Sequence, residues 1–242
     1  MLLNFLLLSI FIFTTAGALG IKPAILFAST AIKPIPEIIL QQISSSQISL
    51  NLASNYSFAV GDQNHNGNLE PQEFQNIYTT LFSFLYDVQV SQQFIDNSFI
   101  LAQVMARDNT LNQNEFFFLT SINLAFLSNN IELLRGNNTD MLVAAVNNVE
   151  TYFAQRQLIL PLLFKQTLVN GENLISLDDF KFGFTLLSKR LGFDISFTDA
   201  ILNDFFEVID TNQKGGVSEL QTDVLLYGIL TNIQSLLNSL LL

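Results

Sequence analysis

Apolar residues recur at helical spacing along much of the chain, and short polar stretches interrupt them. One apolar stripe follows the polar stretch 61–74, and two more flank a second polar stretch near residue 210. Apolar side chains three and four positions apart share one face of an α-helix, so each stripe predicts an amphipathic helix. The stripes consist of Phe74, Ile77, Tyr78, Leu81 and Phe82; of Ile201, Leu202, Phe205, Phe206 and Ile209; and of Leu225, Leu226, Ile229 and Leu230. The pattern therefore predicts helices joined by polar loops.

The polar loop from residue 62 to residue 73 places oxygen-bearing side chains at alternate positions. A calcium ion takes six to eight oxygen ligands at about 2.3–2.6 Å, and a twelve-residue loop supplies them from alternate positions. Gly67 permits the sharp turn at the sixth position, and Glu73 can close the loop with both carboxylate oxygens. The predicted ligands are Asp62, Asn64, Asn66, Asn68 through its carbonyl oxygen, Glu70 and Glu73. The sequence thus predicts a Ca²⁺ site.

This loop resembles the EF-hand calcium-binding family at every defining position, and that family places a helix on each side of the loop. The resemblance implies an all-α fold made of two EF-hand pairs, with short β-bridges between paired loops. In the family the bridge joins the eighth positions of two loops. The resemblance therefore implies that Leu69 faces Leu111 and that Ile175 faces Val217.

Three further stretches repeat the layout, with loops that begin at residues 104, 168 and 210. The spacing within each pair is 42 residues, because 104 minus 62 and 210 minus 168 give the same number, and a shift of 106 maps the first pair on the second. This spacing is typical of a duplicated unit. Val104 and Leu168 occupy first positions and cannot coordinate a hard cation, so their loops are predicted to serve as structural partners. Ordinary helix–turn–helix corners are the alternative for these two loops.

The fourth loop is a doubtful calcium site. Lys214 brings a positive charge to a ligand position, and Gln221 replaces the closing carboxylate with a single neutral oxygen. Both changes lower the affinity for a cation. Its candidate ligands are Asp210, Asn212, Gly216, Ser218 and Gln221.

The charge and composition limit the function further. The chain has 21 acidic and 10 basic residues, a net charge of -11, which argues against a nucleic-acid partner. Two asparagines among the ligands of loop 62–73 keep its charge low, and a low charge indicates an affinity in the extracellular range, about 10⁻⁴ to 10⁻³ M. With 3 methionines against 23 phenylalanines, the composition favours a structural or buffering ion over a sensor with a flexible groove. The alternative is a calcium-dependent sensor or scaffold that binds an apolar partner helix or lipid.

The first 21 residues carry no charge, and residues 1–18 are interpreted as a signal peptide, with a retained membrane anchor as the alternative. A secreted or luminal protein follows from the first interpretation, with membrane contact not expected after cleavage. The chain has no cysteine, so its core must hold it together without disulfides. Two sequons, at Asn55 and Asn137, fit this route.

The remaining segments define the expected organisation. A connecting region, 19–44, leads to a first pair over 45–135 and a second pair with a C-terminal helix over 139–242. The apolar tail after residue 232 is predicted to pack on the second pair as an extra core helix, or else to dock a partner helix or lie on a membrane. A kink or boundary is expected at Pro161.

Catalysis is not expected from this inventory. The single histidine, His65, lies at a non-ligand position of the loop, and the chain has no cysteine. The residues needed for a His-assisted nucleophile or for a His/Cys zinc site are therefore absent from the sequence. Asp178 and Asp179 are explained by the preference for acids at a helix N-terminus.

Overall fold

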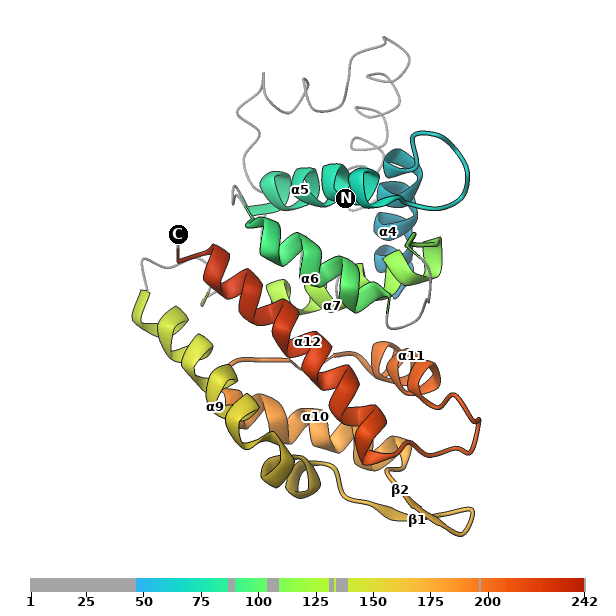
Figure 1. The fold of residues 1–242 in the computed structure, drawn as a ribbon, viewed down its shortest axis with the longest axis vertical. Helices are drawn as coiled ribbons and strands as arrows, with labels where there is room; N and C mark the ends of the chain where they lie inside the picture. The colour runs from blue at the N-terminus through green and yellow to red at the C-terminus, as the bar shows by residue number, and fades with distance from the viewer. Residues whose placement is uncertain are drawn as a thin grey trace.

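A computed structural model of the chain describes residues 47–86, 90–103, 109–130, 133, 139–195 and 197–241, and this part is mostly helical (Figure 1). The predicted all-α class is confirmed at this level. The first half contains α4 (Gln47–Gly61), α5 (Pro71–Tyr86), α6 (Gln92–Ala102) and α7 (Gln113–Asn129). The second contains α9 (Thr139–Leu163), β1 (Thr167–Val169), β2 (Glu172–Leu174), α10 (Leu177–Leu191), α11 (Asp199–Ile209) and α12 (Glu219–Ser239).

Several predictions fall outside the described residues. These are the signal peptide over 1–18, the connecting region 19–44, the second sequon's asparagines and the start of the second loop at Val104. Asn55, from the first sequon, is exposed on α4. Among the described helices, none combines the length and the apolar character needed to cross a bilayer.

The predicted apolar stripes form the helices expected of them. Phe74, Tyr78 and Phe82 on α5 are buried, while Ile77 and Leu81 pack at the edge of the core. The stripes of α11 and α12 are buried throughout. Their burial joins a hydrophobic core that continues through both halves of the described structure.

Two isolated antiparallel bridges join the loops in pairs. Leu69 and Leu111 exchange backbone hydrogen bonds at 2.8 and 3.0 Å, and Ile175 and Val217 do the same at 2.8 and 3.0 Å. All four side chains are fully buried. These are the residue pairs expected from the sequence, and both partners of the first bridge map on the second with the same shift of 106 residues.

The segment before the second bridge differs from the prediction. It was expected to be a degenerate loop with Leu168 at its first position, but β1 and β2 form an antiparallel hairpin in which Leu168 is 75% exposed. Asn170 and Gly171 form its tip with φ angles of 51° and 86°. Asn-Gly favours a two-residue turn in which both residues have positive φ, and the right-handed twist of this turn suits a hairpin.

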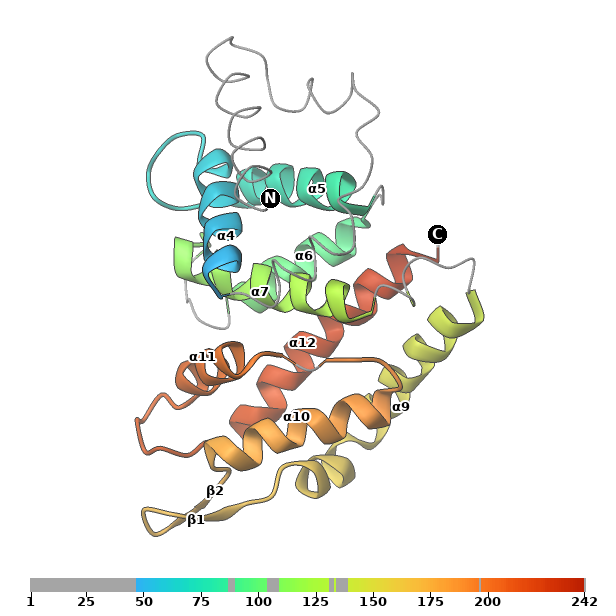
Figure 2. The same cartoon turned by 180° about the vertical axis from the view of Figure 1, so that it is seen from behind.

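Helix α12 joins the two halves. It crosses the molecule and packs most extensively on α6 of the first half and α9 of the second (Figures 1 and 2). The predicted extra helix at the C-terminus is therefore a continuation of α12, and it packs on the first half as well as the second. Pro161 lies inside α9, and the expected boundary comes two residues after it, where the helix ends at Leu163.

A buried polar network accompanies this contact. The Ser98 hydroxyl donates to Asn232 Oδ1 at 2.6 Å, and Asn232 Nδ2 donates to Asn123 Oδ1 at 2.7 Å. Asn123 Nδ2 in turn donates to the Tyr78 hydroxyl. The chain of bonds links α6, α12, α7 and α5, so it ties the two halves through specific partners rather than apolar contact alone.

Candidate metal-binding loop

The loop 62–73 follows α4 directly and runs into the first turn of α5 (Figure 1). Gly61 is the last residue of α4, and a Cβ there would meet Leu69 Cδ2 at 3.0 Å and Ile77 Cγ2 at 3.1 Å. The glycine therefore lets the end of α4 lie against the bridge residue Leu69 and the exit helix. This close approach fixes where the loop begins.

The side-chain oxygens at the start of the loop turn inward. Asp62 is 7% exposed, and its two oxygens accept hydrogen bonds from the N–H groups of Asn66, at 3.1 Å, and Gly67, at 2.9 Å. Asn64 Oδ1 also accepts from Asn66 N at 3.0 Å. Asn66 Oδ1 accepts from Asn68 N at 2.8 Å. The loop thus curls around these three side chains.

Glu73 closes the loop from its far end. Its Oε1 accepts from Gln63 N at 3.0 Å and from Asn64 N at 3.3 Å, ten and nine residues earlier. Its Oε2 accepts from Glu70 N at 3.2 Å, which is the usual bond of a carboxylate in the first turn of a helix. One carboxylate therefore caps α5 and also spans the loop.

Glu70 completes the arrangement. Its carboxylate accepts from the side-chain amides of Asn64, at 2.9 Å, and Asn66, at 2.6 Å. Hydrogen bonding with Glu73, and next with Asn66, holds the pKa of Glu70 below its ordinary value. All six predicted ligands are thus joined in one hydrogen-bonded set, in which the half-buried Asn68 takes part through its backbone N–H.

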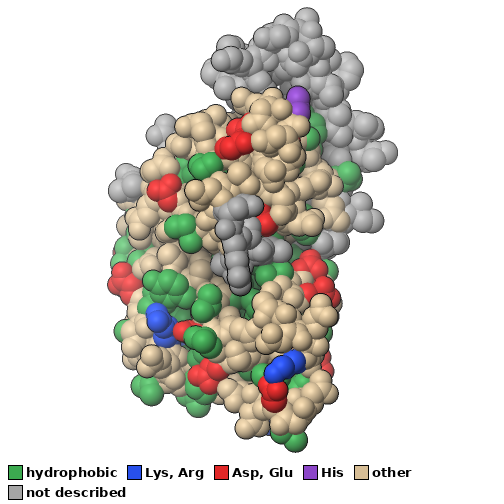
Figure 3. All heavy atoms as spheres, turned by 45° about the vertical axis from the view of Figure 1, so that its right-hand side comes forward, with side chains coloured by type: hydrophobic (Ala, Val, Ile, Leu, Met, Phe, Trp, Pro, Cys, Tyr) green, Lys and Arg blue, Asp and Glu red, His purple; other side chains and the backbone are tan. Residues whose placement is uncertain are grey.

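The backbone of loop 210–221 repeats that of loop 62–73. His65 and Gln213, both at fourth positions, have φ angles of 57° and 51°, and the glycines at the sixth positions, Gly67 and Gly215, have 82° and 72°. Asp210 accepts from Lys214 N at 3.0 Å and from Gly215 N at 2.8 Å, as Asp62 does in its own loop. His65 is exposed, as expected, and its side chain is visible at the surface in Figure 3.

The other end of loop 210–221 is built differently. Gln221 Oε1 accepts from Ser218 N at 2.8 Å, whereas its Nε2 donates to the Ile209 carbonyl. The Lys214 ammonium contacts both oxygens of Glu172 on β2, at 2.6 and 2.8 Å. Asn212 is exposed, and Gly216 is buried.

The twelfth-position acids of the remaining loops both bond to the N-cap residue of the helix that follows. Glu115 accepts from Asn112 N at 2.8 Å and from its side-chain amide at 2.7 Å. Asp179 accepts from the Ser176 hydroxyl at 2.6 Å. Asp178 and Asp179 lie in the first turn of α10, the position expected from the sequence.

Asn170 and Glu172, the third and fifth residues of the predicted third loop, both contact Lys214. Asn170 Nδ2 donates to the backbone carbonyl of Lys214 at 2.7 Å, and the Glu172 carboxylate forms an ion pair with its ammonium. The Asn-Gly dipeptide could have identified the hairpin, but nothing local in the sequence indicates that its tip reaches a residue more than 40 positions later.

Within the described residues, no three His, Cys, Asp or Glu side chains gather as a metal-binding group. Loop 62–73 instead combines carboxylates with asparagine amides, and calcium accepts both kinds of oxygen. Comparison with protein-family models and with curated protein sequences finds no match for this chain.

Proposed function

We propose that the protein binds one Ca²⁺ ion in loop 62–73, in a helix–loop–helix pair of EF-hand type, and that the ion stabilises the fold. The observation that carries the proposal is the reach of Glu73, whose carboxylate caps α5 and also binds the N–H groups at the start of the loop. A carboxylate held across a loop in this way can supply two oxygens to an ion inside it.

The charge in the loop supports a cation as its occupant. Asp62, Glu70 and Glu73 bring three carboxylates into twelve residues that contain no lysine or arginine. The amide groups of Asn64 and Asn66 satisfy only part of this charge through Glu70. A divalent cation would neutralise more of it, and the inward Oδ1 atoms of both asparagines are suitable further ligands.

The pairing of the loops supports the EF-hand interpretation. Both bridges lie at eighth positions, counted from Asp62 and Asp210, and the same backbone angles recur in the two loops that keep an acidic first residue. A partner loop that fixes its neighbour through a bridge gives the binding loop a defined shape. We infer that loops beginning at residues 104 and 168 have this supporting role.

The packing around the loop supports a structural role over a sensor role. Phe74, directly after the loop, stacks on Tyr78 with ring centroids 4.7 Å apart and meets Phe99 edge-on at 5.3 Å. The alternative is a sensor or scaffold for an apolar helix or lipid. It has less support, because α12 of the chain itself already packs along α6. A secreted or luminal setting, where calcium is abundant, would suit a site of low ligand charge.

Calcium titration by isothermal calorimetry tests the proposal. We expect the full chain to bind one ion with a dissociation constant of about 10⁻⁴ to 10⁻³ M, and Glu73→Gln to abolish the heat signal. Glu115→Gln is the matched control, since it makes the same change at the same position of the partner loop. The proposal would be refuted if the folded wild-type protein released or absorbed no heat on calcium addition. It would also be refuted if Glu73→Gln and Glu115→Gln lost the binding heat equally.

A further inference from the structure

We infer that loop 210–221 keeps the shape of a cation loop and is closed without metal: the Gln221 amide joins its two ends, and the ion pair between Lys214 and Glu172 ties it to the hairpin. The inference rests on the proposed function of loop 62–73, because that loop is the standard of comparison. It assigns a structural role to Lys214 and Gln221, which would otherwise only weaken a calcium site. It also predicts which substitutions would turn this loop into a calcium site.

The first half of loop 210–221 keeps the backbone shape of loop 62–73. Asp210 binds the N–H groups of the fifth and sixth residues, and positive φ angles recur at the fourth and sixth positions. These are the same features that shape loop 62–73. The two loops therefore differ in side-chain chemistry and not in the path of the backbone over this part.

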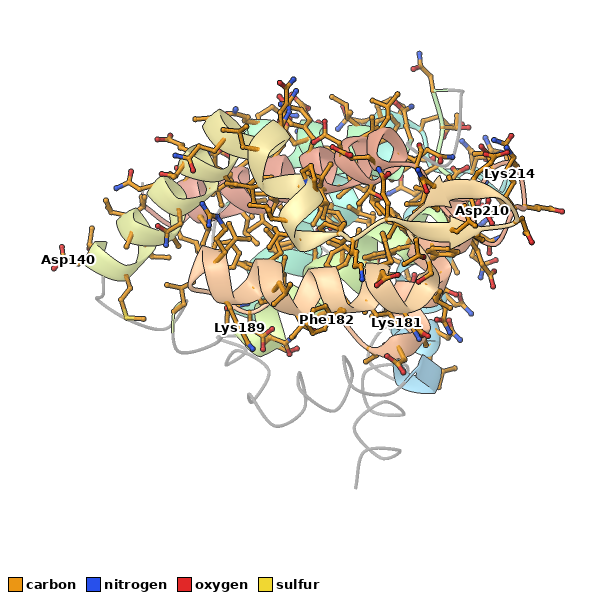
Figure 4. All side chains as sticks on the ribbon, turned by 90° about the horizontal axis from the view of Figure 1, so that it is seen from below. Asp140, Lys181, Phe182, Lys189, Asp210 and Lys214 are labelled. Atoms are coloured by element: carbon orange, nitrogen blue, oxygen red, sulfur yellow. The ribbon has the colours of Figure 1, made fainter. Side chains whose placement is uncertain are left out.

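Lys214 occupies the fifth position, where loop 62–73 has Asn66. Its ammonium lies 2.6 Å from Glu172 Oε1 and 2.8 Å from Oε2, so it forms a two-point ion pair across to the hairpin. Figure 4 shows Lys214 and Asp210 together at the end of the molecule formed by this loop. The Lys214 side chain also offers no oxygen to a divalent ion, and its positive charge lowers the affinity of the loop for one.

Gln221 occupies the twelfth position and reverses the polarity of the closing group. Its Oε1 is taken by the N–H and the hydroxyl of Ser218, at 2.8 and 2.9 Å. Its Nε2 donates to the carbonyl of Ile209, just before the loop, and lies 3.4 Å from the Thr211 hydroxyl. Glu73 presents a hydrogen-bond acceptor, its carboxylate Oε1, to the start of its loop, whereas Gln221 presents a donor, its amide Nε2. The Gln221 amide therefore links the two ends of the loop directly, as a bound ion would through its ligands.

The hairpin clamps the loop from outside. Asn170 Nδ2 donates to the Lys214 carbonyl at 2.7 Å, and a Cβ on Gly216 would come within 2.8 Å of Leu174 Cβ. The bridge between Ile175 and Val217 adds the next contact along the chain. The fifth, seventh and eighth residues of the loop are thus held by the hairpin. This explains how the loop keeps the shape of a cation site with no ion.

The test restores the acceptors of loop 62–73 in loop 210–221. In a Glu73→Gln background, which silences the first loop, the pair Lys214→Asn and Gln221→Glu should raise the number of calcium ions bound from zero to one by calorimetry. A control with Lys214→Met and Gln221→Leu removes the same groups without adding acceptors, and it should bind none. Folding of each variant is checked by circular dichroism.

The outcomes separate this inference from the proposed function. A calcium event in Glu73→Gln that Gln221→Ala removes would overturn the inference, since loop 210–221 would then bind an ion unaided. A folded triple variant that binds nothing would also overturn it. If the wild type binds no calcium but the triple variant binds one, the proposed function fails and the inference stands.

A second measurement does not depend on engineering a site. Lys214→Met should lower the melting temperature by about 1–3 °C, because a half-exposed ion pair contributes little, and by the same amount with or without calcium. A loss that calcium restores would contradict the inference, because loop 210–221 would then bind an ion while Gln221 still closes it.

Discussion

Replacement of Asn232 by alanine should destabilise the whole molecule, because its amide joins α12 to the first half. Asn232 is fully buried, accepts from the Ser98 hydroxyl and donates to Asn123 Oδ1. The truncation leaves both of these partner atoms without their bond. A buried polar group that loses its partner costs about 1–3 kcal/mol, so the two together cost about 2–6 kcal/mol of unfolding free energy.

This loss is large for a single side chain and easy to measure. In a chain of this size 1 kcal/mol corresponds to about 2–4 °C, so we expect the melting temperature to fall by at least about 4 °C. Guanidinium unfolding followed by circular dichroism gives the free energy directly. Asn238→Ala is the matched control, since Asn238 is exposed near the end of the same helix and should change stability by less than about 0.5 kcal/mol.

A double-mutant cycle separates the hydrogen bond from simple loss of volume. Ser98→Ala and Asn232→Leu each break the bond between the two side chains, and the double variant removes both of its ends. The two effects should then be less than additive by about 0.5–3 kcal/mol. Additive effects, or an Asn232→Ala protein as stable as the Asn238→Ala control, would refute the reasoning.

Three further predictions concern calcium, packing and pH. At 10 mM calcium, a dissociation constant of about 10⁻⁴ to 10⁻³ M adds about 1.4–2.7 kcal/mol to the free energy of unfolding. In scanning calorimetry, calcium should therefore raise the melting temperature of the wild type by about 3–10 °C, and that of Glu73→Gln hardly at all. Gly183→Ala should lower the free energy of unfolding by about 1–3 kcal/mol, measured by chemical denaturation, because the new Cβ would overlap the Phe164 ring. This cost exceeds the gain from the better helix propensity of alanine. Gly228→Ala is the control and should cost less, because its Cβ would meet only the flexible end of Leu101. Burial raises the pKa of Tyr78 above its ordinary value, so the unfolded state loses that proton first and stability falls as pH rises above about 10. Tyr78→Phe should make this alkaline decline shallower in pH-dependent unfolding.

The sequence predicted the parts of the fold that depend on local periodicity and on paired spacing. The apolar stripes that begin at residues 74, 201 and 225 form buried helix faces, because the apolar side chains of each stripe lie on one side of the helix and pack against the core. The bridges at Leu69 and Ile175 were implied by the resemblance to EF-hand loops, and the apolar residues at the eighth positions agree with it. Such features need no knowledge of distant partners.

Features that depend on contact between distant segments were not predictable in the same way. The C-terminal apolar residues indicated a helix, but their periodicity could not show that this helix continues α12 and meets α6 of the first half. The Asn-Gly pair at 170–171 signals a hairpin, yet the ion pair between Glu172 and Lys214 depends on where the hairpin tip lies in space. At the candidate site the ligand types were readable from spacing, whereas the bond from Glu73 to Gln63 required the folded loop.

The magnitudes of these effects bear on the role proposed for a bound ion. Glu73 and Tyr78 lie on the same helix, five residues or about 7.5 Å apart along its axis. A rotation of α5 large enough to open a groove would therefore strain the bond between Tyr78 and Asn123 and, through it, the contact with Asn232. Loss of the bond between Tyr78 and Asn123 costs about 1–3 kcal/mol, while a weak calcium site would supply about 1.4–2.7 kcal/mol at 10 mM. An ion bound as proposed would thus supply about as much free energy as this bond costs to break, which supports the proposed structural role, in which Glu73 and the Tyr78 bond are both satisfied.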